Sequence, residues 1–250
     1  MNSSKHWEFQ ETEHRPFPMP DSNWAMTQVW NDVFFAHWPC EPEKIKKLLP
    51  ESIELDTFNG TAWISLVSFH ITDFRFRYLP PIPHLNFVPE LNVRTYVINK
   101  GIPSIYFFSL DTTRYSAVLG ARLGTGLPYR KAKMGMETGR DRHVTFKSSF
   151  TKAGNQEDFR ASYQPGPKMY EPEKESLEFW LLERYRLYSF QRNQLVYIDI
   201  HHDQWKISDV RADIKENTMA PCLLPQTDKA PSLMHYARRR HCFFYPIKKA

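Results

Sequence analysis

The amino-acid sequence predicts an α+β fold made mainly of antiparallel strands, and two observations support that prediction. Most apolar segments are short and alternate with polar residues, which is the period of a half-buried strand. Only a few segments place apolar residues at helical spacing. No segment repeats at a fixed period, and no low-complexity linker divides the 250 residues. We therefore expect an extended, proline-rich arm over residues 1–23 and a single domain over residues 24–250.

The first half of the chain predicts strands around one short helix. The expected helix covers residues 41–49, because Pro42 suits a first helical turn and Ile45 and Leu49 share one face. Residues 79–89 are rich in proline and predict a loop. The expected strands of this half are residues 24–38, 61–71, 92–98, 104–110 and 116–123.

The second half of the chain predicts further strands and one longer helix. Residues 172–190 are expected to form this helix, which begins at Pro172 and carries an apolar stripe on one face. The stripe consists of Leu177, Trp180, Leu181, Tyr185 and Tyr188. A short helix is expected near residues 231–237. The expected strands of this half are residues 143–150, 159–163, 195–201, 204–210 and 242–247.

Composition limits the classes of function. Hydrophobic residues make up 41% of the chain, which is enough for a sizeable core, and the net charge of +5 permits an anionic ligand. Cys40, Cys222 and Cys242 form no CxxC pair, which argues against a disulfide framework or a zinc site. The N-terminal segment lacks the apolar core of a signal peptide, and no stretch reaches the roughly 18 apolar residues of a membrane span. We expect a cytoplasmic protein with no membrane partner.

One strand carries a row of polar side chains that indicates either a solvated surface or the lining of a pocket. Glu90, Asn92, Arg94 and Tyr96 occupy alternate positions and therefore share one face. Arg94 lies among apolar neighbours, so we expect it to point inward. A buried guanidinium group needs a partner, and we expect either Glu90 or Asp111 to supply the carboxylate.

A second segment combines cations directly after a Leu-Pro-Tyr sequence. Arg130, Lys131 and Lys133 follow Tyr129. Neighbouring cations and burial both lower the pKa of a lysine, and a lysine with a lowered pKa attacks carbonyl groups. The alternative is that these are three surface cations on a loop.

Two other clusters favour structural interpretations. His201, His202 and Asp203 have metal-ligating side chains, but neighbouring residues of a strand face opposite ways, so we expect no metal there. Residues 238–240 are three consecutive arginines without interleaved aromatic residues, so we expect no nucleic-acid partner. The chain has no GxSxG, GxxxxGK[ST], HExxH or GxGxxG motif, and no cofactor is expected.

At these residues the sequence resembles the YqjF-like family of uncharacterised bacterial proteins, which is grouped with acetoacetate decarboxylase. The resemblance is carried by residues 41–74 and by three motifs. These motifs are PELNVRTYV (residues 89–97), YFFSLD (residues 106–111) and LPYRKAKM (residues 127–134). The resemblance implies a strongly bent antiparallel sheet that forms a cone or barrel, with a pocket inside and a few helices outside. It also implies assembly into a homo-oligomer.

The resemblance predicts an activity less well than it predicts the fold, because decarboxylases of this group place a Schiff-base lysine directly after Tyr-Pro. Here Pro128 is followed by Tyr129, and the nearest lysine is Lys131. Three hypotheses follow. The first is a module that binds a small anionic or carbonyl-bearing molecule, the second an enzyme that forms an imine at Lys131, and the third a structural or interaction protein. The residues expected to bind the ligand are Glu90, Asn92, Arg94, Tyr96, Tyr129 and Arg130.

Overall fold

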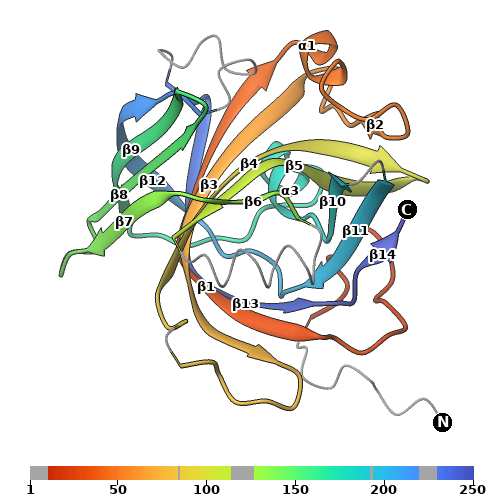
Figure 1. Cartoon of the computed structure of the whole chain (residues 1–250), viewed down its shortest axis with the longest axis horizontal. Helices are drawn as coiled ribbons and strands as arrows, with labels where there is room; N and C mark the ends of the chain where they lie inside the picture. The colour runs from red at the N-terminus through yellow and green to blue at the C-terminus, as the bar shows by residue number, and fades with distance from the viewer. Residues whose placement is uncertain (1–10, 84, 114–126, 192–193, 220–229) are drawn as a thin grey trace.

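Strands of one large sheet dominate the computed structural model (Figure 1). The structure describes residues 11–83, 85–113, 127–191, 194–219 and 230–250. The strands are β1 (Met26–Cys40), β2 (Glu54–Leu55), β3 (Ala62–Phe76), β4 (Val88–Asn99), β5 (Ile102–Thr112), β6 (Tyr129–Lys131), β7 (Lys133–Thr138), β8 (Val144–Lys152), β9 (Asn155–Pro165), β10 (Arg186–Gln191), β11 (Gln194–His201), β12 (Ser208–Asn217), β13 (Leu233–Phe244) and β14 (Lys248–Lys249). The helices are α1 (Pro42–Lys46) and α3 (Leu177–Leu182).

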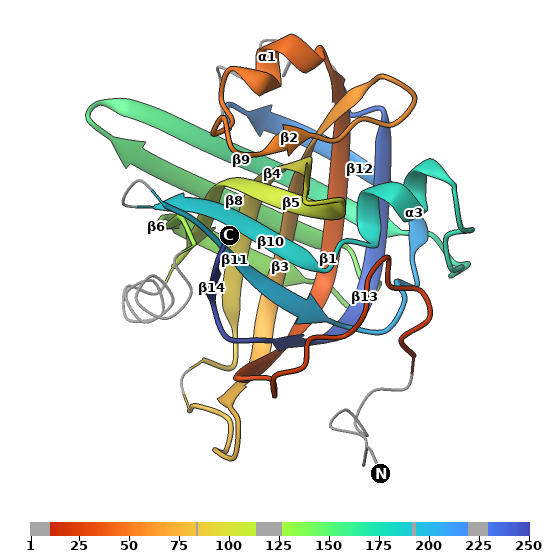
Figure 2. The same ribbon diagram turned by 90° about the vertical axis from the view of Figure 1, so that its right-hand side faces the viewer.

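Seven of these strands close into a ring. Their order in the sheet is β11-β10-β5-β4-β3-β1-β13, and β13 pairs back with β11 through the pairs Ile200 with Phe244 and His201 with Phe243. The sheet then continues from β13 through β12, β9, β8 and β7, which form a wing beside the ring (Figure 2). Most neighbours are antiparallel, while β5 pairs in parallel with β6 and β10. The prediction of a bent, mainly antiparallel sheet is therefore confirmed.

The long strands β1 and β3 are apolar on both faces because each face meets a different core. Phe35 and Val67 belong to the core inside the ring. Phe34 and Leu66, one residue before them, belong to a second core that includes wing residues such as Phe146. A side chain on either face of these strands is therefore removed from water, which stabilises the closed ring and its junction with the wing.

The predicted helix over residues 172–190 is wrong at both ends. The helix α3 covers only Leu177–Leu182, and the Ser176 hydroxyl group caps it by accepting a hydrogen bond of 3.1 Å from the backbone of Phe179. The chain then becomes extended, because Leu187 and its neighbours pair with both β11 and β5. Leu181 of the predicted stripe is therefore buried from α3, whereas Tyr188 is buried from β10.

Other predicted boundaries also change. Residues 231–237 are not helical, since β13 begins at Leu233 and pairs with β1 along most of its length. Helix α1 ends at Lys46, before the predicted residue 49, and the strand expected over residues 204–210 begins only at Ser208. The expected strand over residues 116–123 lies outside the described residues.

The described part of the N-terminal arm, residues 11–23, packs against the ring. The His14 ring nitrogen Nε2 lies 3.0 Å from the backbone oxygen of His202, and an Arg15 nitrogen donates to the backbone oxygen of Ile200 at 2.8 Å. These contacts attach the arm to the end of β11. Within the described residues, no helix is both long enough and apolar enough to cross a membrane.

Candidate functional site

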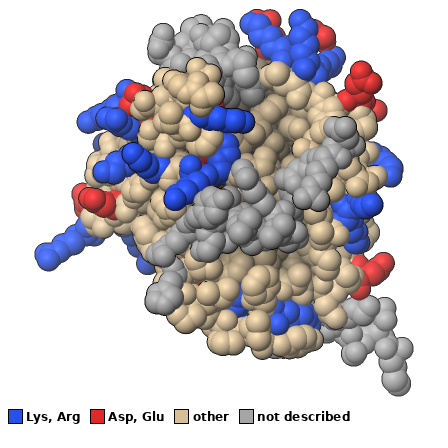
Figure 3. Space-filling model, in the orientation of Figure 1, with Lys and Arg blue, Asp and Glu red and all other residues tan. Residues whose placement is uncertain are grey.

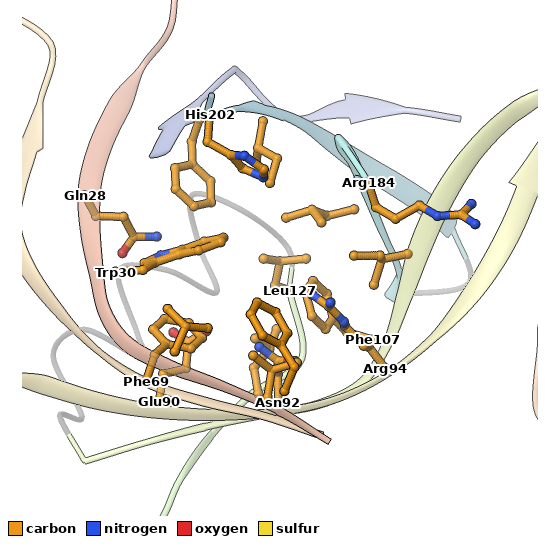
Figure 4. A pocket seen from close by; sticks show the side chains of 18 of the residues that line it. Gln28, Trp30, Phe69, Glu90, Asn92, Arg94, Phe107, Leu127, Arg184 and His202 are labelled. Carbon is orange, nitrogen blue, oxygen red and sulfur yellow. The ribbon is translucent and has the colours of Figure 1, made fainter. Parts of the chain in front are cut away.

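A cavity lies inside the ring of strands, and every strand of the ring contributes to its wall (Figure 4). Most of the wall is apolar or aromatic. The residues that line it are Gln28, Trp30, Val33, Phe35, Val67, Phe69, Glu90, Asn92, Arg94, Ile105, Phe107, Leu110, Leu127, Tyr129, Leu182, Arg184, Leu187, Ile200, His202, Trp205 and Phe244. The cavity has a free volume of about 30 Å³, and its apolar wall with a few inward polar groups is typical of small-molecule sites.

Glu90 and Tyr129 form a polar pair in this wall. Glu90 is on β4 and Tyr129 is on β6, and the Tyr129 hydroxyl group donates a hydrogen bond of 3.2 Å to Glu90 Oε2. Only 4% of Glu90 is exposed. Burial raises the pKa of Glu90 to about 8, although hydrogen bonds from Tyr129 and Asn92 oppose that change. The carboxyl group is therefore mainly protonated near neutral pH and is able to donate a proton.

Arg94 lies in the same wall, and the expected ion pair with Glu90 or Asp111 is not formed. Asp111 instead accepts two hydrogen bonds from Arg130, of 2.6 and 3.0 Å. Within the described part of the chain, no carboxylate lies within ion-pair distance of Arg94, which is 7% exposed. Its guanidinium group hydrogen bonds to Tyr96 and lies 5.7 Å from the ring of Phe35.

Two buried polar atoms of this strand lack hydrogen-bond partners, namely Arg94 Nε and Asn92 Oδ1. An unpaired buried polar group costs about 1–3 kcal/mol, so a ligand that accepts a hydrogen bond from Arg94 Nε would recover the cost of that atom. The cavity thus combines an unbalanced cation, an amide oxygen and a neutral carboxyl group on one strand.

Three residues proposed for the site lie outside the cavity wall. Tyr96 is buried but does not line the cavity, and its hydroxyl group lies 2.5 Å from the Ser65 hydroxyl group. Arg130 turns to the opposite side of its strand, where it pairs with Asp111 and with Glu157 at 2.9 Å. Lys131 is exposed at the end of β6.

The structure also brings to the cavity many residues that sequence analysis did not assign to it, among them two pairs that carry polar or aromatic side chains. Gln28 and Trp30 come from β1, while His202 and Trp205 come from the segment that follows β11. The adjacent pair His201 and His202 was the only available signal. As expected of neighbours near a strand end, they separate: His202 lines the cavity, whereas His201 Nδ1 lies 3.2 Å from Arg15 in the arm.

Most charged side chains of the described residues lie outside the cavity wall. In the described part of the chain, no group of three or more His, Cys, Asp or Glu side chains is placed to hold a metal ion. Of the three consecutive arginines, Arg238 and Arg239 are exposed, and Arg240 lies over the ring of Trp205 at 5.4 Å. Figure 3 shows Lys and Arg side chains in separate groups on the visible face, with Asp and Glu among them.

Comparisons with known proteins agree with this architecture. The DUF2071 family, described as an uncharacterized conserved protein, matches residues 27–241. The uncharacterized protein YqjF of Bacillus subtilis is 45% identical over 240 residues, covering 95% of this chain and 97% of YqjF. The crystal structure of acetoacetate decarboxylase from Legionella pneumophila has a TM-score of 0.59 at 15% identity, covering 94% of this chain and 92% of that one. The enduracididine biosynthesis enzyme MppR, complexed with pyruvate, has a TM-score of 0.58 at 10% identity, covering 92% and 91%. These structures share the fold.

Proposed function

The chain belongs to the DUF2071 family of uncharacterized conserved proteins, and we propose that it binds a small carboxylate that also carries a carbonyl group. The ligand occupies the cavity inside the ring of strands. Its carboxylate group bonds to Arg94, and its carbonyl oxygen accepts a hydrogen bond from Glu90 or Tyr129.

The observation that carries this proposal is the buried Arg94 guanidinium group without a carboxylate partner among the described residues. The other arginine in the wall, Arg184, is already neutralised, because it donates to Asp56 at 2.7 Å. Its guanidinium group also points away from the cavity centre (Figure 4). Among the described residues of the wall, Arg94 therefore offers the uncompensated positive charge to a ligand, and charge-assisted hydrogen bonds are the strongest available to it.

The neutral carboxyl group of Glu90 supports a carbonyl-bearing ligand over a simple anion. A protonated carboxyl group and a phenol both donate hydrogen bonds, whereas a second carboxylate in the same cavity would repel an anion. Pyruvate is an obvious first probe, since MppR, which has the same fold, was solved with it.

Calorimetric titration of the whole chain tests the proposal with matched ligands. Pyruvate, 2-oxobutanoate and 4-oxopentanoate have both groups, while butanoate lacks the carbonyl group and butanone lacks the carboxylate. We expect the oxo acids to bind more tightly than either single-function molecule. The absence of binding by all three oxo acids would contradict the proposal and favour a cavity that serves only packing.

Substitutions of Arg94 test whether its guanidinium group bonds to the carboxylate of the ligand. Arg94→Met should weaken oxo-acid binding about tenfold or more, because a charge-assisted hydrogen bond contributes about 1.5–3 kcal/mol. Arg94→Lys should retain part of the affinity. Arg160→Met is the matched control, since Arg160 lies on the wing with 63% of its side chain exposed, in an ion pair with Glu216. Equal affinities in Arg94→Met and Arg160→Met would show that Arg94 does not hold the ligand.

A further inference from the structure

Beyond binding, the geometry points to proton transfer at carbon: we propose that the cavity interconverts the keto and enol forms of a small oxo acid. His202 is the base and Glu90, supported by Tyr129, is the acid. This inference rests on the proposed binding of an oxo acid to Arg94. It requires no imine and no lysine.

The hydrogen bonds of His202 determine which of its ring nitrogens is the base. Its Nδ1 atom lies 2.8 Å from the backbone oxygen of Asp203. A carbonyl oxygen only accepts, so Nδ1 carries the hydrogen atom and Nε2 holds a free lone pair in the neutral ring. Within the described part of the chain, no residue donates to that Nε2 atom.

The surroundings of His202 keep the ring neutral and fixed. It is 2% exposed and packs against the rings of Tyr185 and Trp205, with centroid distances of 4.7 and 4.9 Å. Burial lowers the pKa of His202 well below 6.5, and the hydrogen bond to Asp203 opposes this change only in part. The imidazole is therefore available as a base at neutral pH.

The acid lies on the opposite wall. Glu90 is on β4 and His202 directly follows β11. In the ring of seven strands, β4 and β11 are nearly opposite, because β4 is the third strand from β11 in one direction and the fourth in the other. Figure 4 shows His202 on one side of the cavity and Glu90 with Asn92 on the other. A flat carbonyl compound between them would meet the base at a carbon and the acid at its oxygen.

The step needs no further reactant. His202 Nε2 takes a proton from the carbon next to the carbonyl group, and the electron pair of that C–H bond forms the C=C bond. The carbonyl π electrons move to the oxygen, which takes the proton of the Glu90 carboxyl group. The products are the enol, an imidazolium and a carboxylate. The reverse step returns both protons, and exchange of the imidazolium proton with solvent replaces the original hydrogen atom of the substrate.

Hydrogen–deuterium exchange measures this step directly. The whole chain is incubated with 2-oxobutanoate in D₂O, and proton NMR follows the loss of the C3 methylene signal against a protein-free sample. We expect exchange above the buffer rate. Because positioned acids and bases contribute about 10²–10⁴ in rate, Glu90→Gln and His202→Gln should each slow exchange at least tenfold. Tyr129→Phe should slow it less.

Binding of 2-oxobutanoate, measured on the same samples, separates this inference from the proposed function. Glu90→Gln should still bind, because Arg94 is intact, but should exchange at least tenfold more slowly than the wild type. Lys131→Gln is the matched control and should exchange at the wild-type rate. Binding by the wild type without exchange would overturn the inference and leave the binding proposal standing, and no binding would overturn both. Loss of exchange in Lys131→Gln would replace this mechanism with imine formation.

Discussion

The Tyr129 hydroxyl group donates a hydrogen bond of 3.2 Å to the carboxyl group of Glu90 inside the cavity. Tyr129 directly follows Pro128, so the side chain beside Glu90 after this proline is a phenol. Burial raises the pKa of Glu90, and the hydrogen bond from this phenol opposes that change only in part.

The first prediction concerns stability and pH. Burial raises the pKa of Glu90 from 4.5 to about 8, so between these values the folded chain binds more protons than the unfolded chain. The free energy of unfolding contributed by Glu90 therefore falls as pH rises from about 4.5 to about 8. Glu90→Gln removes this dependence, so the variant should gain stability relative to wild type as pH rises.

Urea unfolding at pH 5, 6, 7, 8 and 9 measures this difference. Each pKa unit corresponds to about 1.4 kcal/mol, so the relative gain should total on the order of several kcal/mol across the window. Burial also raises the pKa of Glu183 to about 7. Glu183 is present in both proteins, so its contribution to the pH dependence of stability cancels in the comparison. Parallel curves for the two proteins would contradict the raised pKa.

The second prediction concerns the buried ion pair beneath α3. Arg184 Nη1 donates to Asp56 Oδ2 at 2.7 Å, with Arg184 side-chain exposure of 2%. Asp56→Asn should destabilise the chain by about 3–5 kcal/mol, because it leaves the guanidinium charge buried and uncompensated. The double variant Asp56→Leu with Arg184→Leu should recover much of that loss.

Denaturant unfolding checks this comparison, with the exposed pair Arg160 and Glu216 as the control. Removing the Glu216 carboxylate should cost less than about 1 kcal/mol, since exposed pairs contribute little. A cost for Asp56→Asn as small as that of the control would show that Arg184 reaches water.

Local patterns predicted the strands of the ring well where alternation or apolar content was strong. Residues 92–98 and 104–110 were predicted as strands and lie within β4 and β5. The same alternation placed Glu90, Asn92 and Arg94 on one face, and all three line the cavity. These features depend on the alternation of side chains along a single strand, which can be read directly from the sequence.

Features that depend on distant partners were not predictable in this way. Residues 172–190 fit the pattern of one helix, but Leu187 becomes a strand residue because β5, far earlier in the chain, pairs with it. Likewise, His202 enters the cavity only because β11 pairs with β13 and closes the ring. Arg94 was expected to find a carboxylate, yet Asp111 on the next strand turns to Arg130 instead. Pairing and side-chain competition of this kind are set by the tertiary structure.

The third prediction compares two tryptophans near the cavity. Trp205 is 2% exposed, donates to the backbone oxygen of Leu182 at 3.1 Å and meets the ring of Phe35 edge-on. Trp205→Ala should cost about 3–5 kcal/mol in thermal or urea unfolding. Trp180 is only half-buried on α3, so Trp180→Ala should cost clearly less. The reverse order would mean that α3, and not the cavity wall, carries the main packing.

The last prediction concerns imine formation. Lys131 lies two residues after Tyr129, and a shift of two residues on a strand keeps the same face. Tyr129 lines the cavity, but β6 ends at Lys131, whose side chain is exposed and does not line it. The amine of Lys131 is therefore not positioned to attack the carbonyl group of a molecule in the cavity. We therefore expect no mass gain on Lys131 when the chain is treated with borohydride and pyruvate, as measured by peptide mass spectrometry.

Lys131→Met serves as the control for any background labelling. A borohydride-dependent adduct that maps to Lys131 and disappears in Lys131→Met would establish an imine-forming enzyme.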